Sequence, residues 1–154
     1  MNARLYETAG ALTDEERKRD LGAFFHSLHG TLNHLLLADR IWLGRFLGDA
    51  PLKMPLDGEL YADFDELRRE RVRTDDEIVV WIDAMTDDRL AASFSYSNSR
   101  GESFQHPLWY AVLHCFNHQT HHRGQATTLL MQLGKDPGVT DLIGLLRTPD
   151  WAST

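Results

Sequence analysis

The segment between Pro107 and Gly134 constrains the fold of this chain more than any other feature. It contains no proline, and its apolar residues recur with the period of an α-helix. Pro107 suits the first turn of a helix, and the run from Gly134 to Gly138, rich in glycine and proline, is typical of a helix end. The sequence therefore predicts one long helix that fills this segment.

The rest of the chain contains further helical stretches and one change of period. Apolar spacing, capping residues and turn residues predict these elements: a short helix over 2–11, a charged turn capped by Thr13 or Asp14, long helices over about 23–47 and about 65–85, and a short helix over about 140–146. Around 94–105 the pattern predicts a small β-hairpin or extended insertion, with its turn at 97–101. We expect an all-α fold, a four-helix bundle with this insertion before the last long helix, as a single domain over 1–154.

The spacing of apolar residues also predicts which faces of the other two long helices are packed. For the helix over about 23–47 the expected packed residues are Phe24, Leu28, Leu35, Trp42 and Phe46. For the helix over about 65–85 they are Leu67, Val72, Ile78, Val79, Ile82 and Met85. The charged residues from Arg68 to Arg71 are expected to form a solvated outer face.

Histidines are concentrated in the segment between Pro107 and Gly134. Four of the eight histidines in the chain lie within nine consecutive residues, at positions 114, 118, 121 and 122. His118 and His122 are four residues apart, so a helix directs both imidazoles to the same side, within an apolar stripe. His114 and Gln125 lie beside that stripe, and His121 turns toward solvent. We therefore expect His118 and His122 to be the inward pair.

Two interpretations of the inward pair are open. The histidines could be buried side chains that hydrogen-bond to carboxylates or carbonyls, which is the common role of a single histidine on an apolar face. Two imidazoles in one apolar stripe both need polar partners, and a shared cation provides one. Since imidazole is a good ligand for zinc, nickel, copper and iron, the spacing favours a metal site that needs a third ligand from elsewhere.

His34 is the first candidate for the third ligand. It lies at the edge of the packed stripe of the helix over about 23–47. Its neighbours on the same face are mostly small and would leave room for a ligand between helices: Ser27, Gly30, Thr31, Ala38 and Ile41. His26 and His29 lie one to two turns earlier, and either could replace His34 if the helix has a different register.

Several other polar residues near the histidines need an interpretation. Cys115 could be a soft metal ligand or a nucleophile, but a free cysteine in this setting is more often a small buried apolar side chain. Asp39 is rotated away from His34, which favours a salt bridge to Arg123 or Arg40 over a role as general base. Gln125 and Asn117 could orient the imidazoles through their second ring nitrogens.

Composition limits the class of protein. The chain has 154 residues, of which 42% are hydrophobic and 25% are charged, enough for one sizeable core. A formal net charge of −7 disfavours nucleic acid and anionic membranes as partners. The single cysteine excludes an internal disulfide framework, and no signal peptide or apolar run of spanning length is visible. We therefore expect a cytoplasmic protein.

Two stretches of the sequence closely resemble the signature regions of the DinB family, in the DinB/YfiT-like superfamily. These stretches run from Asp20 to Trp42 and from Asn117 to Gln125, and the regions 96–101 and 136–142 are also similar. The resemblance implies a four-helix bundle, commonly a homodimer, with three histidines around a divalent metal, nickel or zinc. By position, it implies that His34, His118 and His122 are the metal ligands.

One departure from the family bears on oligomerisation. The first helix of relatives is longer, whereas this chain starts inside the corresponding stretch, at 2–6. Either the start of the chain is assigned late, or the bundle lacks part of one wall. A shorter first helix would leave apolar surface that a partner subunit could cover, which favours a dimer.

Three functions are compatible with these features. The first is a metal-dependent hydrolase or a thiol-dependent transferase, because the resemblance makes a low-molecular-weight thiol a plausible cosubstrate beside an unknown small-molecule substrate. The second is a non-catalytic metal-binding or stress-response dimer, in which His114 or Cys115 fills the fourth metal position. The third is a structural dimer whose histidines bind no metal. An open metal position distinguishes the first function from the second.

Overall fold

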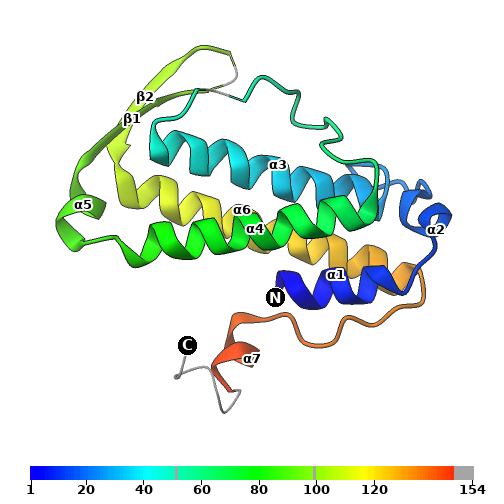
Figure 1. The fold of residues 1–154 in the computed structure, drawn as a ribbon. Coiled ribbons are helices and arrows are strands. Elements are labelled where there is room, and N and C mark those ends of the chain that lie inside the picture. The colour runs from blue at the N-terminus through cyan, green and yellow to red at the C-terminus, as the bar shows by residue number, and fades with distance from the viewer. Residues whose placement is uncertain (51, 99, 148–154) are drawn as a thin grey trace.

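The protein is mostly helical, with one small antiparallel sheet (Figure 1). The computed structural model describes residues 1–50, 52–98 and 100–147. Its elements follow in this order: α1 Asn2–Gly10, α2 Asp14–Lys18, α3 Leu28–Leu47, α4 Phe64–Asp83, α5 Asp87–Ala91, β1 Ser93–Ser97, β2 Ser103–Pro107, α6 Leu108–Gln132 and α7 Leu142–Leu146. The predicted all-helical class and the predicted hairpin before the last long helix are both confirmed.

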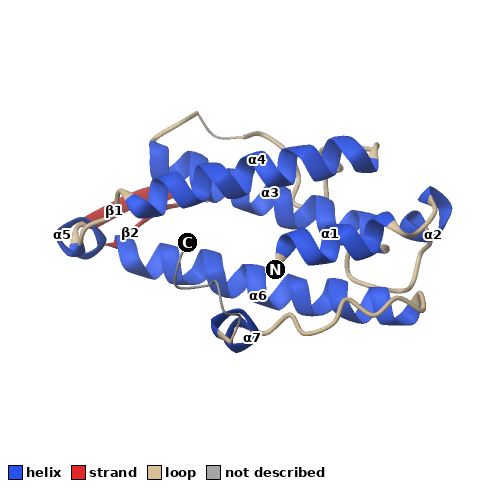
Figure 2. Ribbon diagram, turned by 60° about the horizontal axis from the view of Figure 1, so that its bottom comes forward, coloured by secondary structure: helices blue, strands red, loops and turns tan. Residues whose placement is uncertain are grey.

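The main core lies where α1, α3, α4 and α6 pack along one another (Figure 2). All four helices contribute to its buried residues, and Leu12 comes from the connection after α1: Leu5, Tyr6, Ala9, Leu12, Leu28, Leu32, Leu35, Leu36, Phe64, Leu67, Ala126, Leu129 and Leu130. A second apolar cluster, around Leu43, Trp81 and Leu108, fills the end of the helices near the hairpin. The long helix α3 is therefore packed on several sides, and α6 lies against it over much of its length.

The helix α3 begins later than the sequence predicts. Ser27 caps it by accepting a hydrogen bond from the Gly30 backbone N–H, and Gly48, with φ of 78°, ends it in the left-handed conformation. Residues 21–27 instead form a tight turn, in which His26 has φ of 63°. The prediction that Phe24 packs in the helix stripe is wrong, because the turn leaves its side chain 82% exposed.

The helix α4 has the predicted extent, but part of its predicted packing is wrong. Asp63 caps it at the Glu66 N–H. Val72 and Val79, expected in the packed face, are more than half exposed, whereas Arg71, expected in the solvated face, is 2% exposed. The buried face of α4 therefore includes a charged residue in place of two valines.

The hairpin leads directly into the histidine helix. Strands β1 and β2 pair antiparallel, with Ser93 opposite Pro107, and Pro107 is also the N-cap residue of α6. The hairpin and α5 lie at one end of the long helices, while the turn between α1 and α3 lies at the other end (Figure 1). Among the described residues, no helix is long and apolar enough to cross a membrane.

Candidate metal centre

Three histidines from two helices meet between α3 and α6. His34 comes from α3, and His118 and His122 come from α6, where their spacing of four residues puts them on one face. One ring nitrogen of each histidine lies within 4.8 Å of the corresponding atoms of the other two. The structure therefore brings together the three residues that the sequence selects.

The second ring nitrogen of two of these histidines has a fixed hydrogen-bond partner. His34 Nδ1 lies 2.7 Å from the carbonyl oxygen of Leu56, so Nδ1 must donate and Nε2 is left as an acceptor. That Nε2 atom lies 3.3 Å from His118 Nε2. His122 Nδ1 lies 2.7 Å from Oε1 of Gln125, which has the same effect on His122. Both hydrogen bonds direct Nε2 lone pairs toward the centre of the cluster.

One of the two predicted orienting residues is confirmed by these contacts. Gln125 accepts from His122, and its Nε2 lies 3.3 Å from His121 Nε2. Asn117 is exposed, and its side chain makes no hydrogen bond within the described part of the chain. The spacing favours Gln125 because it lies three residues after His122, within reach on the same helix face.

Phe25 forms an apolar wall of the cluster. Its ring stacks on that of His34, with centroids 3.9 Å apart, and lies 5.5 Å from the His122 ring. The backbone of Phe25 approaches α3 so closely that a Cβ on Gly30 would lie 2.2 Å from the Phe25 carbonyl oxygen. The prediction that small side chains near Gly30 leave room for a ligand is therefore wrong at this position, because Phe25 occupies that space.

The cluster favours neutral imidazoles. Burial lowers the pKa of His34 and of His122. Burial, together with the neighbouring histidines, lowers the pKa of His118 to about 3. All three side chains are therefore neutral at physiological pH, which is the protonation state that binds a metal.

The residues present fit a divalent metal. A late first-row ion binds imidazole nitrogen at about 2.0–2.1 Å, which requires separations of roughly 3–3.5 Å between ligand nitrogens. The nitrogens of His34 and His118 already have this separation, and small rotations would bring His122 into range. Three neutral nitrogen donors, two of them on oriented rings, and no carboxylate or thiolate in the cluster suit zinc, nickel or copper better than magnesium or calcium.

The other histidines near the site lie outside this cluster. His26 is exposed in the turn and lies 3.5 Å from Asp20. His29 is buried, but its Nε2 faces the Tyr61 carbonyl oxygen at 2.9 Å and Glu59 at 3.2 Å. Of the three candidates for the third position, only His34 joins the pair on α6.

Asp39 has a different partner from the ones that the sequence suggests. Its Oδ2 lies 2.7 Å from Nη1 of Arg71, and both side chains are 2% exposed. Arg40 instead pairs with Glu70, and Arg123 donates to Gln119. Arg71 also lies 2.7 Å from Asp75, in an ion pair without hydrogen-bond geometry. Because its carboxylate is committed to Arg71, Asp39 is not available as a general base for the cluster.

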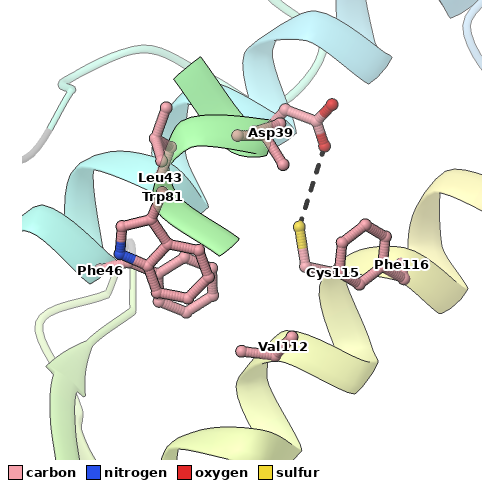
Figure 3. A pocket seen from close by; sticks show the side chains of 8 residues that line it. Asp39, Leu43, Phe46, Trp81, Val112, Cys115 and Phe116 are labelled. Atoms are coloured by element: carbon pink, nitrogen blue, oxygen red, sulfur yellow. Dashed lines mark hydrogen bonds between the residues drawn. The ribbon is translucent and has the colours of Figure 1, made fainter. Parts of the chain in front are cut away.

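Cys115 is a buried thiol beside Asp39, the acidic member of this ion pair (Figure 3). Its Sγ points toward Asp39, 4.0 Å from Oδ1, across a cavity of about 10 Å³ that is otherwise lined by apolar side chains. Burial and the nearby carboxylate raise the pKa of Cys115 to about 12. The structure thus favours the interpretation of Cys115 as a small buried side chain over that of a ligand or nucleophile.

The fold and the cluster together define a class, that of small helical proteins in which histidines from facing helices form a potential metal site. The chain belongs to the DinB family, whose model matches residues 1–151, and this confirms the resemblance. A crystal structure of a DinB-like protein from Bacillus cereus ATCC 10987 is similar, with a TM-score of 0.66 and 21% identity over 90% of this chain and 89% of that chain. At 21% sequence identity, this similarity shows that the two proteins share a fold. No curated protein matches the sequence significantly.

Proposed function

We propose that this protein binds a divalent metal through His34, His118 and His122 and uses it as a hydrolase or as a thiol-dependent transferase. One observation carries the proposal: three neutral imidazoles from two helices place their donor atoms within 4.8 Å of one another. The hydrogen bonds from His34 to Leu56 and from His122 to Gln125 support it, because they fix the ring tautomers for metal binding.

The chemistry follows from three protein ligands. A divalent ion with a position left for substrate would act as a Lewis acid, which lowers the pKa of a bound water or thiol toward neutrality. The chain itself provides His34 and His122 in fixed orientations, and the Phe25 ring, which covers one side of the cluster. The described residues at the cluster contribute no carboxylate base, so a substrate or solvent group would carry the proton.

Further properties belong to the same proposal. We expect zinc or nickel as the ion, because three imidazoles accept both. We also expect one four-helix bundle domain that forms a homodimer in the cytoplasm. An unknown small molecule, with a low-molecular-weight thiol as possible cosubstrate, is the expected partner, and neither nucleic acid nor membrane is expected. The single cysteine and the acidic net charge support these expectations.

Metal content per chain tests the site. Protein purified without an affinity tag should contain close to one metal per chain, and His34→Ala, His118→Ala and His122→Ala should each lose it. The matched control is His121→Ala, an exposed histidine on the same helix, which should keep the metal. Retention of metal in all three variants, with circular dichroism showing a native helix content, would refute the site.

Turnover separates an enzyme from a non-catalytic metal-binding protein. Wild-type protein and His118→Ala should be assayed for hydrolysis of activated esters and for thiol transfer from cysteine to an electrophile. Turnover that depends on His118 supports the enzyme. Stoichiometric metal without turnover on either substrate class would favour the non-catalytic function.

A further inference from the structure

A large cleft lies between the second half of α3, the hairpin and the first turns of α6. Its volume is about 510 Å³. We call it the aromatic cleft, and its lining includes Trp42, Arg45, Tyr96, Tyr110 and His114. A volume in this range accommodates a small organic molecule. The hairpin, which folds back over this end of α3 and α6, supplies one side of the cleft (Figure 1).

Arg45 is the one side chain with a permanent charge in this lining. Its guanidinium carbon lies 4.6 Å from the centre of the Trp42 ring and 5.1 Å from that of Tyr96, in cation–π contact with both. The lining contains no carboxylate, and within the described part of the chain Arg45 forms no salt bridge. In a protein of net charge −7, this arginine is held in an aromatic setting, and none of the described acidic residues pairs with it.

The electrostatics of the cleft favour an anion. Burial lowers the pKa of Arg45, and Tyr96 is the one neighbour that opposes this effect. The guanidinium still remains protonated, since its ordinary pKa lies far above neutrality. A half-buried cation without a counterion is best satisfied by a planar anion, because guanidinium forms paired hydrogen bonds with a carboxylate.

The rings around Arg45 suit the apolar part of a ligand. Tyr96 stacks against Phe94 and Phe104, which holds its ring in place. Tyr110 lies in the first turn of α6, lines the cleft and is 52% exposed. Neither tyrosine hydroxyl makes a hydrogen bond within the residues that the structure describes. Rigid rings with free hydroxyls can both stack on a ligand and donate to it.

His114 lies between the cleft, which it lines, and the three-histidine cluster. The His114 ring lies 5.1 Å from Trp42 and 5.9 Å from His118. Along α3, His34 and Arg45 are eleven residues apart, close to a whole number of turns, so they share one face about 16 Å apart along the axis. Long side chains lean toward the start of their helix, which brings the Arg45 guanidinium nearer to His34.

We propose that the aromatic cleft binds a small organic acid, with the carboxylate on Arg45 and a flat apolar body against Trp42, Tyr96 and Tyr110. The binding site stands on the geometry of the cleft alone. Its role rests on the proposed function, because the far end of such a ligand would extend past His114 toward the histidine cluster. The inference therefore assigns a substrate class to that function: carboxylic acids whose reactive group lies several bonds away from the carboxylate.

Binding of a matched pair of probes tests the proposal. The probes are 2-naphthoate and its neutral amide, 2-naphthamide, with 2-naphthalenesulfonate as an anion that ligates metals poorly. Dissociation constants are measured by ligand-observed NMR on the metal-loaded protein. Wild-type protein should bind both anions about five- to tenfold more tightly than the amide. Arg45→Met, which keeps the apolar stem but removes the charge, should abolish this preference.

Three further variants make the result specific. Arg45→Lys should retain part of the preference, and Arg69→Met, at an exposed arginine on α4, should retain all of it. Arg45→Gln serves as a second neutral variant if Arg45→Met does not fold. His118→Ala, which should lose the metal, should still prefer the anions, because Arg45 and not the metal holds them.

The outcomes distinguish this inference from the proposed function. A preference for the anions that survives Arg45→Met overturns the inference, as does an equal affinity for anions and amide in wild-type protein. A preference lost in His118→Ala but kept in Arg45→Met would place the anion at the histidine cluster, which supports the metal site and refutes the role of Arg45. If Arg45→Met contains as much metal as the wild type, the loss of the anion preference in this variant does not come from damage to the three-histidine site.

Discussion

Asp39 on α3 and Arg71 on α4 form an ion pair in the interior, with Oδ2 and Nη1 2.7 Å apart and both side chains 2% exposed. Removal of one partner would leave the other as a buried charge without compensation. Arg71→Ala should therefore lower the free energy of unfolding by about 3–5 kcal/mol. Urea denaturation would measure this change.

Two variants control for that prediction. Arg69→Ala, an exposed arginine on the same helix, should change the free energy of unfolding by less than about 0.5 kcal/mol. Combined replacement by Asp39→Leu and Arg71→Met should cost less than Arg71→Ala, because neither charge remains buried. If Arg71→Ala and Arg69→Ala lowered the free energy of unfolding equally, the predicted contribution of the Asp39–Arg71 pair to stability would be contradicted.

Removal of the metal should lower the melting temperature. A ligand at a hundred times its dissociation constant stabilises the native state by about 2.7 kcal/mol, which for a chain of this size raises the midpoint by roughly 5–10 °C. Scanning calorimetry with zinc and with excess chelator would measure the difference. His118→Ala should melt at the same temperature with zinc and with chelator. A difference between the two conditions as large as that of the wild type would count against the metal site.

Gln125 should contribute to metal affinity although it is not a ligand. Its Oε1 holds His122 Nδ1 at 2.7 Å, and loss of such a partner typically weakens metal binding about 10- to 100-fold. Gln125→Leu should show this loss in competition with a chromogenic chelator. Asn117→Leu is the matched control, since this carboxamide on the same helix is exposed and forms no hydrogen bond to a described histidine, and it should bind metal like the wild type.

Cys115 should be unreactive in the native protein. Its thiol is buried, and its pKa is raised to about 12, so almost no thiolate forms near neutrality. Iodoacetamide should label it only after unfolding in urea, as mass spectrometry would show. Cys115→Ala should retain the full metal content. Rapid labelling of the folded protein, or a loss of metal in that variant, would restore Cys115 as a candidate ligand.

The metal-free protein should become less stable as the pH falls. The pKa of His118 is about 3 in the folded state, against an ordinary value of 6.5, and burial also lowers that of His34 and His29. Below about pH 6.5 the unfolded chain binds protons that the folded chain does not, so the stability present at neutral pH declines toward pH 3.

Urea denaturation at about pH 7.5 and about pH 5 isolates this effect, because carboxylates titrate mostly below that window. His118→Asn should show a smaller decline than the wild type. Stability that is constant or rises over this interval would mean that the imidazoles are not held neutral by the fold.

The sequence allowed the histidine helix and its inward pair to be predicted because both depend on a single element. The backbone of α6 fixes the direction of His118 relative to His122, so spacing is sufficient. The hairpin could be predicted for the same reason, since its strands and turn are contiguous. The choice of His34 over His29 required the pairing of α3 with α6, which no local pattern contains.

Most of the errors concern contacts between segments that are distant in the sequence. Arg71 lies in a run of charged residues that resembles a solvated face, and its burial depends on Asp39, which is 32 residues away. The Phe25 wall depends on the tight turn before α3, where a helical pattern of apolar residues continues although the helix does not. The aromatic cleft likewise requires Trp42 and Tyr96 to meet across two elements.

The partner of His34 Nδ1 is a main-chain carbonyl, that of Leu56, in the long connection between α3 and α4. Every amino acid carries this group, so evolution can change the side chain at position 56 freely without losing the tautomer of His34. What selection must preserve is the path of that connection and its length. A designer who shortens or reroutes it would alter the metal site without touching any ligand.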